Sequence, residues 1–318
     1  MRIIGADDIN RALTYPALID AIAEAFRADV KVPVRHHHTI AARERSPGTA
    51  ATLLLMPAWT ESGERFLGCK MVTVFPDNAK AGLPSVYGNY FLMSGETGAP
   101  LAIMDGRTLT AWRTGAASAL AARHLAREDA AHLVMVGAGA LAPHLVRAHA
   151  AVRPIRRVTL WNRTRSRAVS LAFGLAVGGV ETEVTDDLEA AVREADIVSC
   201  ATLSSEPLIR GAWLRKGTHV DLVGGFTPKM READDQTVKR ARVYVDTRAG
   251  AAKEAGDIVQ PLKRGVIKQA DIRGDLSELC RSKAKGRTSA TQITLFKSVG
   301  TAIEDLAAAM LVWQRVAS

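Results

Sequence analysis

The sequence is poor in the features that mark secreted and membrane-spanning proteins. It has three cysteines among 318 residues, Cys69, Cys200 and Cys280, and their spacing suggests no pairs. This argues against a disulfide framework and favours a reducing compartment. No apolar run approaches the roughly 18 residues of a membrane helix, and the opening MRIIGADDINRAL lacks the apolar segment of a signal peptide. We therefore expect a cytoplasmic protein with no membrane partner.

Several catalytic and metal-binding patterns are also missing. The chain contains no HExxH, CxxC or GxSxG motif, which argues against metallohydrolases and serine hydrolases. Three consecutive histidines occur at 36–38, but neighbouring residues on a strand point to opposite faces, so we expect no metal site. The net charge of +9 favours an anionic ligand. The basic residues are dispersed and no aromatic-plus-basic motif accompanies them, so nucleic acid is not an expected partner.

The first third of the chain predicts one helix and then a β-rich segment. Apolar residues at helical spacing predict a helix over 7–28. Apolar runs predict strands at 52–56, 66–75, 85–93 and 100–105, in an antiparallel or mixed sheet. SGETGA at 94–99 fits a hairpin link. The Ala- and Leu-rich stretch 108–127 predicts a second helix.

The middle of the chain alternates short apolar runs with helical segments. The predicted strands are 132–137, 157–162, 181–185, 196–202, 219–225 and 242–246, and the predicted helices are 141–152, 165–176 and 187–195. Continuous apolar strands alternating with helices are typical of a doubly wound parallel sheet, the Rossmann arrangement. This α/β domain is expected over 127–288. The tail is expected to be a long helix over 289–316.

A glycine-rich loop follows the first of these strands. VMVGAGALAPHL fits G-x-G-x-x-A at Gly137, Gly139 and Ala142, and Ala140 and Leu141 complete the loop. Such a loop brings backbone and a helix N-terminus to a pyrophosphate. We therefore predict dinucleotide binding; the alternative is a glycine-rich turn that binds nothing.

The end of the second strand bears on which dinucleotide is bound. NAD-specific domains usually place an acid there for the ribose hydroxyls. Here RVTLWN ends in Asn162, and Arg163 and Thr164 follow it. An arginine and a hydroxyl suit a 2′-phosphate, so NADP(H) is the preferred cofactor. A solvated basic turn, which leaves NAD(H) acceptable, is the alternative.

Two cations in the first third are candidates for the substrate site. Lys70 interrupts the apolar run FLGCKMVTVF, and Arg113 lies among small residues in TAWRTGAASA. Each is a candidate for a pocket, and an outward-facing surface residue is an equally good interpretation of either. In HVDLVGGFTPKMREADD, Phe226 stands where an α/β enzyme often places an acid or base. The charged residues 229–235 predict a solvated helix start, with Pro228 near its first turn.

Taken together, Lys70, DGRTLTAWRTGAAS, VGAGALA, LWNRT, VGGFTPKMREADD, EAGDI and FKSVGTAIEDLAAA resemble the ornithine cyclodeaminase/μ-crystallin family along essentially the whole chain. The resemblance implies a homodimer in which residues 1–126 and 289–318 form a mixed α+β substrate-binding and dimerisation domain around the inserted Rossmann domain. It also implies that Arg35, Lys70 and Arg113 hold a substrate carboxylate, with Lys70 and Arg113 catalytic. The cofactor-contacting segments would include Ser85, Thr114, Thr202 and Ser298.

Two departures from the family bear on the reaction. Cyclodeaminases carry acids at the positions that hold Phe226 and Leu54 here. Deamination needs general bases, so an apolar pair favours a compact cyclic substrate. The resemblance then implies NADPH-dependent reduction of the cyclic ketimines 1-pyrroline-2-carboxylate and 1-piperideine-2-carboxylate to L-proline and L-pipecolate. Two alternatives stay open: an ornithine cyclodeaminase that uses NAD with relocated acids, such as Asp77 or Glu254, and a non-catalytic NADPH-dependent ligand-binding protein.

Overall fold

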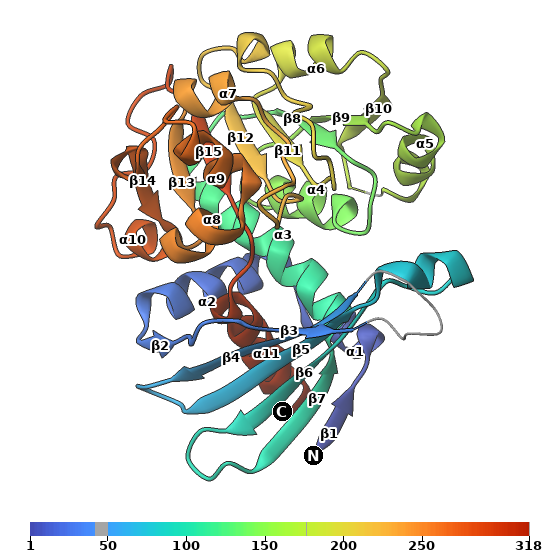
Figure 1. The fold of residues 1–318 in the computed structure, drawn as a ribbon, viewed down its shortest axis with the longest axis vertical. Helices are drawn as coiled ribbons and strands as arrows, with labels where there is room; N and C mark the ends of the chain where they lie inside the picture. Colours follow the sequence, from blue (N-terminus) through green and yellow to red (C-terminus); the bar gives the residue numbers. More distant parts are fainter. Residues whose placement is uncertain (42–49, 176, 318) are drawn as a thin grey trace. The chain divides into compact units, whose positions relative to one another are not determined.

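The computed structural model describes residues 1–41, 50–175 and 177–317. The chain forms two compact units (Figure 1): unit 1 comprises Met1–Arg113 and Thr301–Ser318, and unit 2 comprises Thr114–Gly300. The first boundary falls inside helix α3 (Gly106–Leu125). The sequence placed the two boundaries at 126/127 and 288/289. The carboxyl-terminal segment that belongs to unit 1 therefore begins after Gly300.

Unit 1 is built on a mixed sheet whose order is β1-β7-β6-β5-β4-β2, with β3 also paired to β4. Among the strands that the structure describes here, only the β1–β7 pair is parallel; the other pairs are antiparallel. The strands are β1 (Arg2–Ile4), β2 (Val30–Lys31), β3 (His36–Ile40), β4 (Ala51–Thr60), β5 (Phe66–Val74), β6 (Val86–Ser94) and β7 (Pro100–Asp105), with a 3-10 turn η1 (Pro76–Ala81). The predicted β-rich segment and its hairpin at 94–99 are confirmed.

The helices of unit 1 are α1 (Ala6–Ala12), α2 (Tyr15–Arg27) and α11 (Ala302–Ala317). Helix α11 packs against α2 and against strands β4, β5 and β6. The single predicted helix over 7–28 was wrong. Leu13 and Thr14 are extended, and α2 restarts with Pro16 in its first turn, because proline is well placed at the start of a helix and poorly placed inside one.

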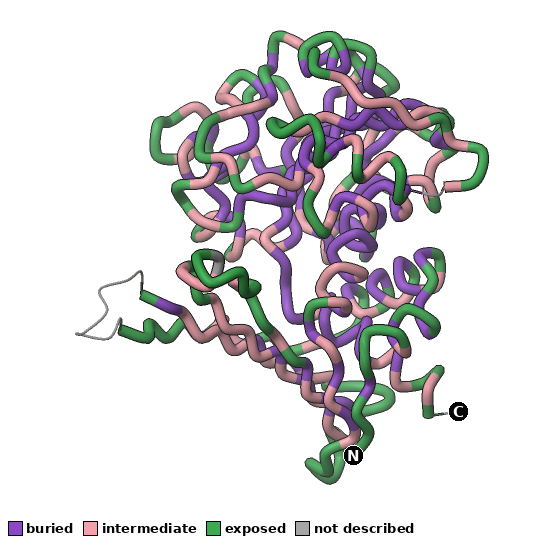
Figure 2. Tube along the Cα trace, turned by 90° about the vertical axis from the view of Figure 1, so that its right-hand side faces the viewer, coloured by how far each residue is buried: buried purple, intermediate pink, exposed green. Residues whose placement is uncertain are grey.

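Unit 2 contains the predicted doubly wound sheet. All eight strands are parallel, in the order β10-β9-β8-β11-β12-β15-β13-β14. Strands β8, β11, β12 and β15 are buried along their whole lengths. Figure 2 shows the buried and exposed stretches along the chain. The strands are β8 (His132–Val136), β9 (Arg157–Trp161), β10 (Glu181–Val184), β11 (Ile197–Cys200), β12 (His219–Leu222), β13 (Arg242–Val245), β14 (Ile272–Asp275) and β15 (Thr294–Lys297).

The order of these strands defines where a ligand binds. From β8 the chain passes to β9 and β10 on one side, and then to β11 and β12 on the other. Ligands of such sheets bind beyond the carboxyl ends of the strands at this reversal. The remaining elements of unit 2 are α4 (Ala142–Ala150), α5 (Arg165–Gly174), α6 (Leu188–Glu194), η2 (Gly211–Trp213), α7 (Asp235–Arg240), α8 (Arg248–Glu254), α9 (Gly256–Lys263), η3 (Gln269–Asp271) and α10 (Leu276–Cys280).

Two local predictions in the last third of the chain were wrong. The expected helix over 289–316 begins only at Ala302, and Thr294–Lys297 forms β15 between β12 and β13. Gly300, with φ +81°, lies between the strand and the helix. The segment 229–235 is not a solvated helix start, because Arg231 is 3% exposed and Glu232 is fully buried. Helix α7 begins only at Asp235, after the N-cap residue Asp234.

Candidate functional site

The phosphate loop of unit 2 has the backbone geometry that its glycines predict. Gly137 has φ +108°, and a Cβ there would lie 2.7 Å from the carbonyl oxygen of Ala201. A side chain is excluded by both conformation and space. A Cβ on Gly139 would meet nothing within 4 Å, so open space lies beside the loop before α4 begins at Ala142. This arrangement fits a pyrophosphate, which needs close approach of backbone at a helix N-terminus.

The end of β9 completes this side of the site. The side-chain oxygen of Asn162 accepts the N–H of Ala138 at 3.2 Å, and its amide donates to the carbonyl of Thr164 at 2.9 Å. Asn162 thus joins the phosphate loop to the start of α5. Arg163 and Thr164 are exposed. The strand end therefore offers an amide, a guanidinium and a hydroxyl where NAD-specific domains usually have a carboxylate.

Two other predicted cofactor residues of unit 2, Thr202 and Ser298, lie at strand ends, and Thr114 lies in a helix. Thr202 follows β11, and its backbone N–H and Oγ1 both donate to Oε1 of Glu232, at 2.6 and 2.8 Å. Ser298 follows β15 and donates to Oδ2 of Asp246 at 3.3 Å. Thr114 is 5% exposed within α3. Gly137 packs against Thr202, since its Cβ would lie 3.2 Å from Cγ2 of the threonine.

In unit 1 the structure brings Lys70 and Arg113 together through two carboxylates of α11. Nζ of Lys70 lies 2.8 Å from Asp305. Nε of Arg113 is 3.0 Å from the same carboxylate, and its Nη1 is 2.6 Å from Glu304. Lys70 is 3% exposed, Arg113 6%, and both acids are fully buried. Neither cation is a surface residue of unit 1, so the outward-facing interpretation was wrong for both.

Burial and charge tune these groups. Burial, together with the charge of Arg113, lowers the pKa of Lys70 from 10.5 to about 8, although Asp305 opposes the shift. For Asp305, burial alone would raise the pKa, but the charges of Arg113 and Lys70 outweigh it and the pKa is lowered. The charge of Arg35 also lowers the pKa of both Lys70 and Asp305, so it acts on this cluster. A lysine that titrates near neutral pH is suited to proton transfer.

The remaining candidates occupy simpler environments. Leu54 is half-buried on β4 opposite Val72 of β5, and Ser85 is half-buried just before β6. Phe226 is 47% exposed beyond β12. Of the relocated acids considered, Asp77 pairs with Lys80 at 2.7 Å on η1, and Glu254 ends α8 in unit 2.

The buried acids of these clusters, among them Glu232, Glu304 and Asp305, were missed by sequence reasoning. The last two lie in AIEDLAAAM, where two adjacent acids interrupt an apolar helix. Buried charges need partners, so that interruption was a usable signal. Glu232 lies within a run of charged residues, and such a run is typical of a solvent-exposed segment. Among the described residues, no grouping of His, Cys, Asp or Glu side chains suits a metal ion.

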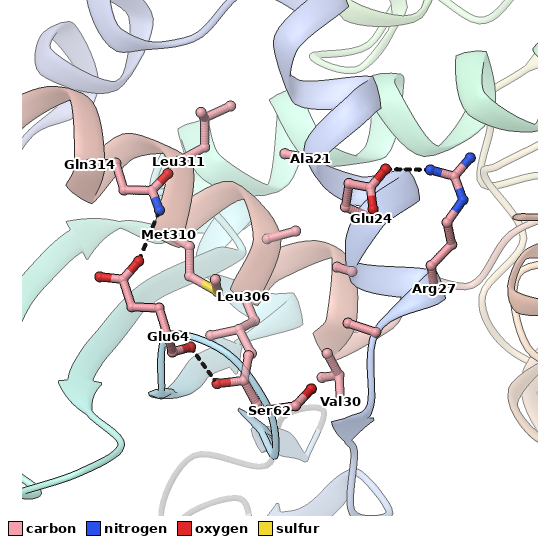
Figure 3. A pocket seen from close by; sticks show the side chains of 14 residues that line it. Ala21, Glu24, Arg27, Val30, Ser62, Glu64, Leu306, Met310, Leu311 and Gln314 are labelled. Carbon is pink, nitrogen blue, oxygen red and sulfur yellow. Dashed lines mark hydrogen bonds and ion pairs between the residues drawn. The ribbon is translucent and has the colours of Figure 1, made fainter.

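Unit 1 also contains a pocket of about 560 Å³ between α2, α11 and the turn after β4 (Figure 3). Its lining is mainly apolar. Its acids are engaged by neighbours in the lining: Glu24 with Arg27, and Glu64 with Gln314. No candidate residue from the sequence lines it, and its polar groups are already paired. We therefore do not place the functional site there.

The fold and these clusters define a class: a Rossmann-type dinucleotide-binding protein in which unit 1 carries buried cations paired with carboxylates. The chain belongs to the ornithine cyclodeaminase/mu-crystallin family, whose pattern matches residues 3–318. A Delta(1)-pyrroline-2-carboxylate reductase of Colwellia psychrerythraea is 38% identical, with complete coverage of both chains.

Among the solved structures that share the fold are two with a bound nicotinamide cofactor. The Delta(1)-pyrroline-2-carboxylate reductase of Thermococcus litoralis, in complex with NADH and L-proline, is 34% identical with a TM-score of 0.92, covering 100% of this chain and 98% of the other. An archaeal alanine dehydrogenase dimer with bound NAD is 29% identical with a TM-score of 0.90, covering 100% and 96%. In the described part of this chain, no helix is long and apolar enough to span a membrane.

Proposed function

We propose that this protein reduces cyclic ketimine carboxylates, 1-pyrroline-2-carboxylate and 1-piperideine-2-carboxylate, to L-proline and L-pipecolate with NADPH. The observation that carries the proposal is the buried Lys70–Arg113 pair on its two carboxylates. The protein is an NAD(P)-dependent oxidoreductase that acts on carbon–nitrogen bonds, the class of its reductase relatives. Unit 2 would bind the cofactor and unit 1 the substrate.

The basic residues of unit 1 suit an anionic substrate. Lys70 and Arg113 are held by Glu304 and Asp305, and the charge of Arg35 acts on the same cluster. The two acids hold the guanidinium of Arg113 in a fixed orientation. A guanidinium fixed in this way can orient a carboxylate, which lowers the entropic part of the barrier. Arg35 and Arg113 would therefore hold the substrate carboxylate.

Reduction of the C=N bond requires one hydride at carbon and one proton at nitrogen. A bound reduced nicotinamide supplies the hydride. Lys70, with its pKa lowered to about 8, is protonated over most of the neutral range and releases a proton more readily than an ordinary lysine. We assign it as the proton donor to the imine nitrogen. The apolar Leu54 and Phe226 would face the ring methylenes, where one methylene changes binding by about 1–3 kcal/mol.

The preference for NADPH rests on the end of β9, where Arg163 is exposed beside Asn162. Arg163→Ala is expected to raise the KM for NADPH about tenfold, since a hydrogen bond to a charged group contributes roughly 1.5 kcal/mol. The KM for NADH should not change. Steady-state titrations with both cofactors measure this, with exposed Arg167→Ala, further along α5, as the matched control. An equal rise for NADPH and NADH would contradict a role in binding the 2′-phosphate.

We also propose that the protein is a cytoplasmic homodimer. The alanine dehydrogenase with the same fold is a dimer, which supports the assembly. Size-exclusion chromatography with light scattering measures it directly.

The function itself is tested by cofactor oxidation. We expect NADPH consumption with both cyclic ketimines and formation of L-proline or L-pipecolate. With L-ornithine and NAD we expect no ammonia release, because the acids beside Lys70 are fully buried counter-ions. Ammonia release from ornithine would replace the proposal with a cyclodeaminase. Tight cofactor binding with no turnover of either ketimine would indicate a ligand-binding protein.

A further inference from the structure

Glu232 is a fully buried acid that joins two strand ends of unit 2. Its Oε1 accepts the backbone N–H and the Oγ1 hydroxyl of Thr202, at 2.6 and 2.8 Å. Its Oε2 accepts the backbone N–H of Gly224 at 2.8 Å and that of Gly225 at 3.4 Å. Thr202 follows β11 and Gly224 follows β12. One carboxylate therefore fixes the backbone beyond both strands.

The backbone that Glu232 holds lies directly against the phosphate loop. A Cβ on Gly137 would lie 2.7 Å from the carbonyl oxygen of Ala201. On the other side, a Cβ on Gly224 would lie 1.9 Å from the carbonyl oxygen of Thr202. The phosphate loop, the segment 201–202 and the turn at 224–225 are thus packed in a row with no room for side chains. A displacement of Thr202 would be transmitted to the loop.

The acid is itself held by a second buried layer. Oδ1 of Asp257, at the start of α9, accepts the backbone N–H groups of Glu232 and Ala233, at 2.8 and 3.0 Å. Oδ2 of Asp257 lies 3.3 Å from Nζ of Lys297, at the end of β15, and both side chains are fully buried. Burial raises the pKa of Glu232 to about 7, while the charge of Lys297 opposes the shift. Burying charged groups costs desolvation free energy, so we expect this network to have a role other than stabilising the fold.

We propose that Glu232 is a positioning residue for the nicotinamide cofactor. Glu232 holds the segment beyond β11 at the distance from the phosphate loop that cofactor binding requires. The proposal rests on the proposed function, because it assumes that the loop at 137–142 binds the cofactor. Glu232 acts through Thr202 and Gly224. It is not assigned any contact with substrate or cofactor.

Glu232→Gln tests this with little change of shape. Glutamine keeps one accepting oxygen, but its NH2 group can only donate, so one pair of donors loses its acceptor. An unsatisfied buried donor costs about 1–3 kcal/mol, so we expect the Kd for NADPH, from fluorescence titration, to rise at least about tenfold. The KM for NADPH should rise with it, while kcat at saturating NADPH stays within about threefold. A Kd within about twofold of the wild-type value would overturn the proposal.

Asp196→Asn is the matched control, because Asp196 is also an acid that accepts backbone N–H groups, at the opposite end of β11. Its carboxylate accepts the backbone N–H groups of Ala131 and His132 at 2.8 and 3.0 Å, and it lies just before Ile197. This variant should lower the Tm without changing the Kd for NADPH. An equal loss of affinity in both variants would mean that Glu232 contributes only to stability, which would contradict the positioning role.

Hydrogen exchange in the wild-type protein tests the same idea if Glu232→Gln does not fold. The amides of Thr202 and Gly224 should be protected without cofactor, since a buried acid already holds them. Rapid exchange that slows only when NADPH is added would overturn the proposal. Failure of the wild-type protein to bind either NADPH or NADH would instead refute the proposed function.

Discussion

Arg113→Ala is expected to lower kcat/KM for the cyclic ketimines by about 10²–10³-fold, mostly through KM. Truncating one member of a buried charged pair costs about 2–5 kcal/mol, and each 1.4 kcal/mol is about tenfold. Arg113 is the buried cation that both Glu304 and Asp305 hold in place. Its loss removes the proposed carboxylate ligand and leaves two buried acids short of a counter-ion. Initial rates over a range of ketimine concentrations measure the effect.

The same substitution will also destabilise unit 1, by about 3–5 kcal/mol, because it leaves an uncompensated buried charge. Two further variants separate stability from binding. Arg113→Met combined with Glu304→Gln removes one charge of each sign, so it should recover stability but not KM. Arg287→Met should lower the Tm with an unchanged ketimine KM, because Arg287 binds the carbonyls of Leu125 and Gly217 at the amino-terminal side of the sheet. A ketimine KM near the wild-type value in Arg113→Ala would contradict the clamp.

Much of the fold follows from local patterns, and the exceptions have physical causes. The strands of unit 2 were recognisable because they are continuous apolar runs, as in β8 and β12. Strand β15 was missed because Ile293, Leu295, Phe296 and Val299 fit a helical spacing as well. Its conformation is decided by pairing with β12 and β13, which a local pattern does not contain.

The candidate site divides in the same way. Lys70 was recognisable because a lysine inside an apolar strand needs an explanation. Its partner Asp305 is 235 residues away, and the partner of Arg113, Glu304, is 191 residues away. Those pairs depend on how α11 packs against the sheet, which the sequence pattern does not reveal. Glu232 was misjudged for a related reason: its burial depends on donors that come from the ends of two strands.

Lys70→Met is expected to lower kcat by about 10²–10⁴-fold, the usual contribution of a positioned proton donor. Methionine fills a similar volume, so the packing of β5 should survive. Lys70→Arg is the companion variant. It keeps the positive charge beside Asp305 but does not release a proton near neutral pH. We expect its ketimine KM to stay close to the wild-type value while kcat falls. A full loss of substrate affinity in Lys70→Arg would instead assign Lys70 to the carboxylate.

The pH dependence of kcat/KM should identify Lys70 as the donor. The pKa of Lys70 is lowered to about 8, so the ammonium form that donates is present below this pH and is lost as the pH rises through it. Because kcat/KM reports the free enzyme, the wild-type profile should fall above about pH 8. The imine nitrogen also titrates, but it does so equally with every variant. Comparing wild type with Lys70→Met and Lys70→Arg therefore isolates the lysine, and persistence of the same limb in both variants would exclude it as the proton donor.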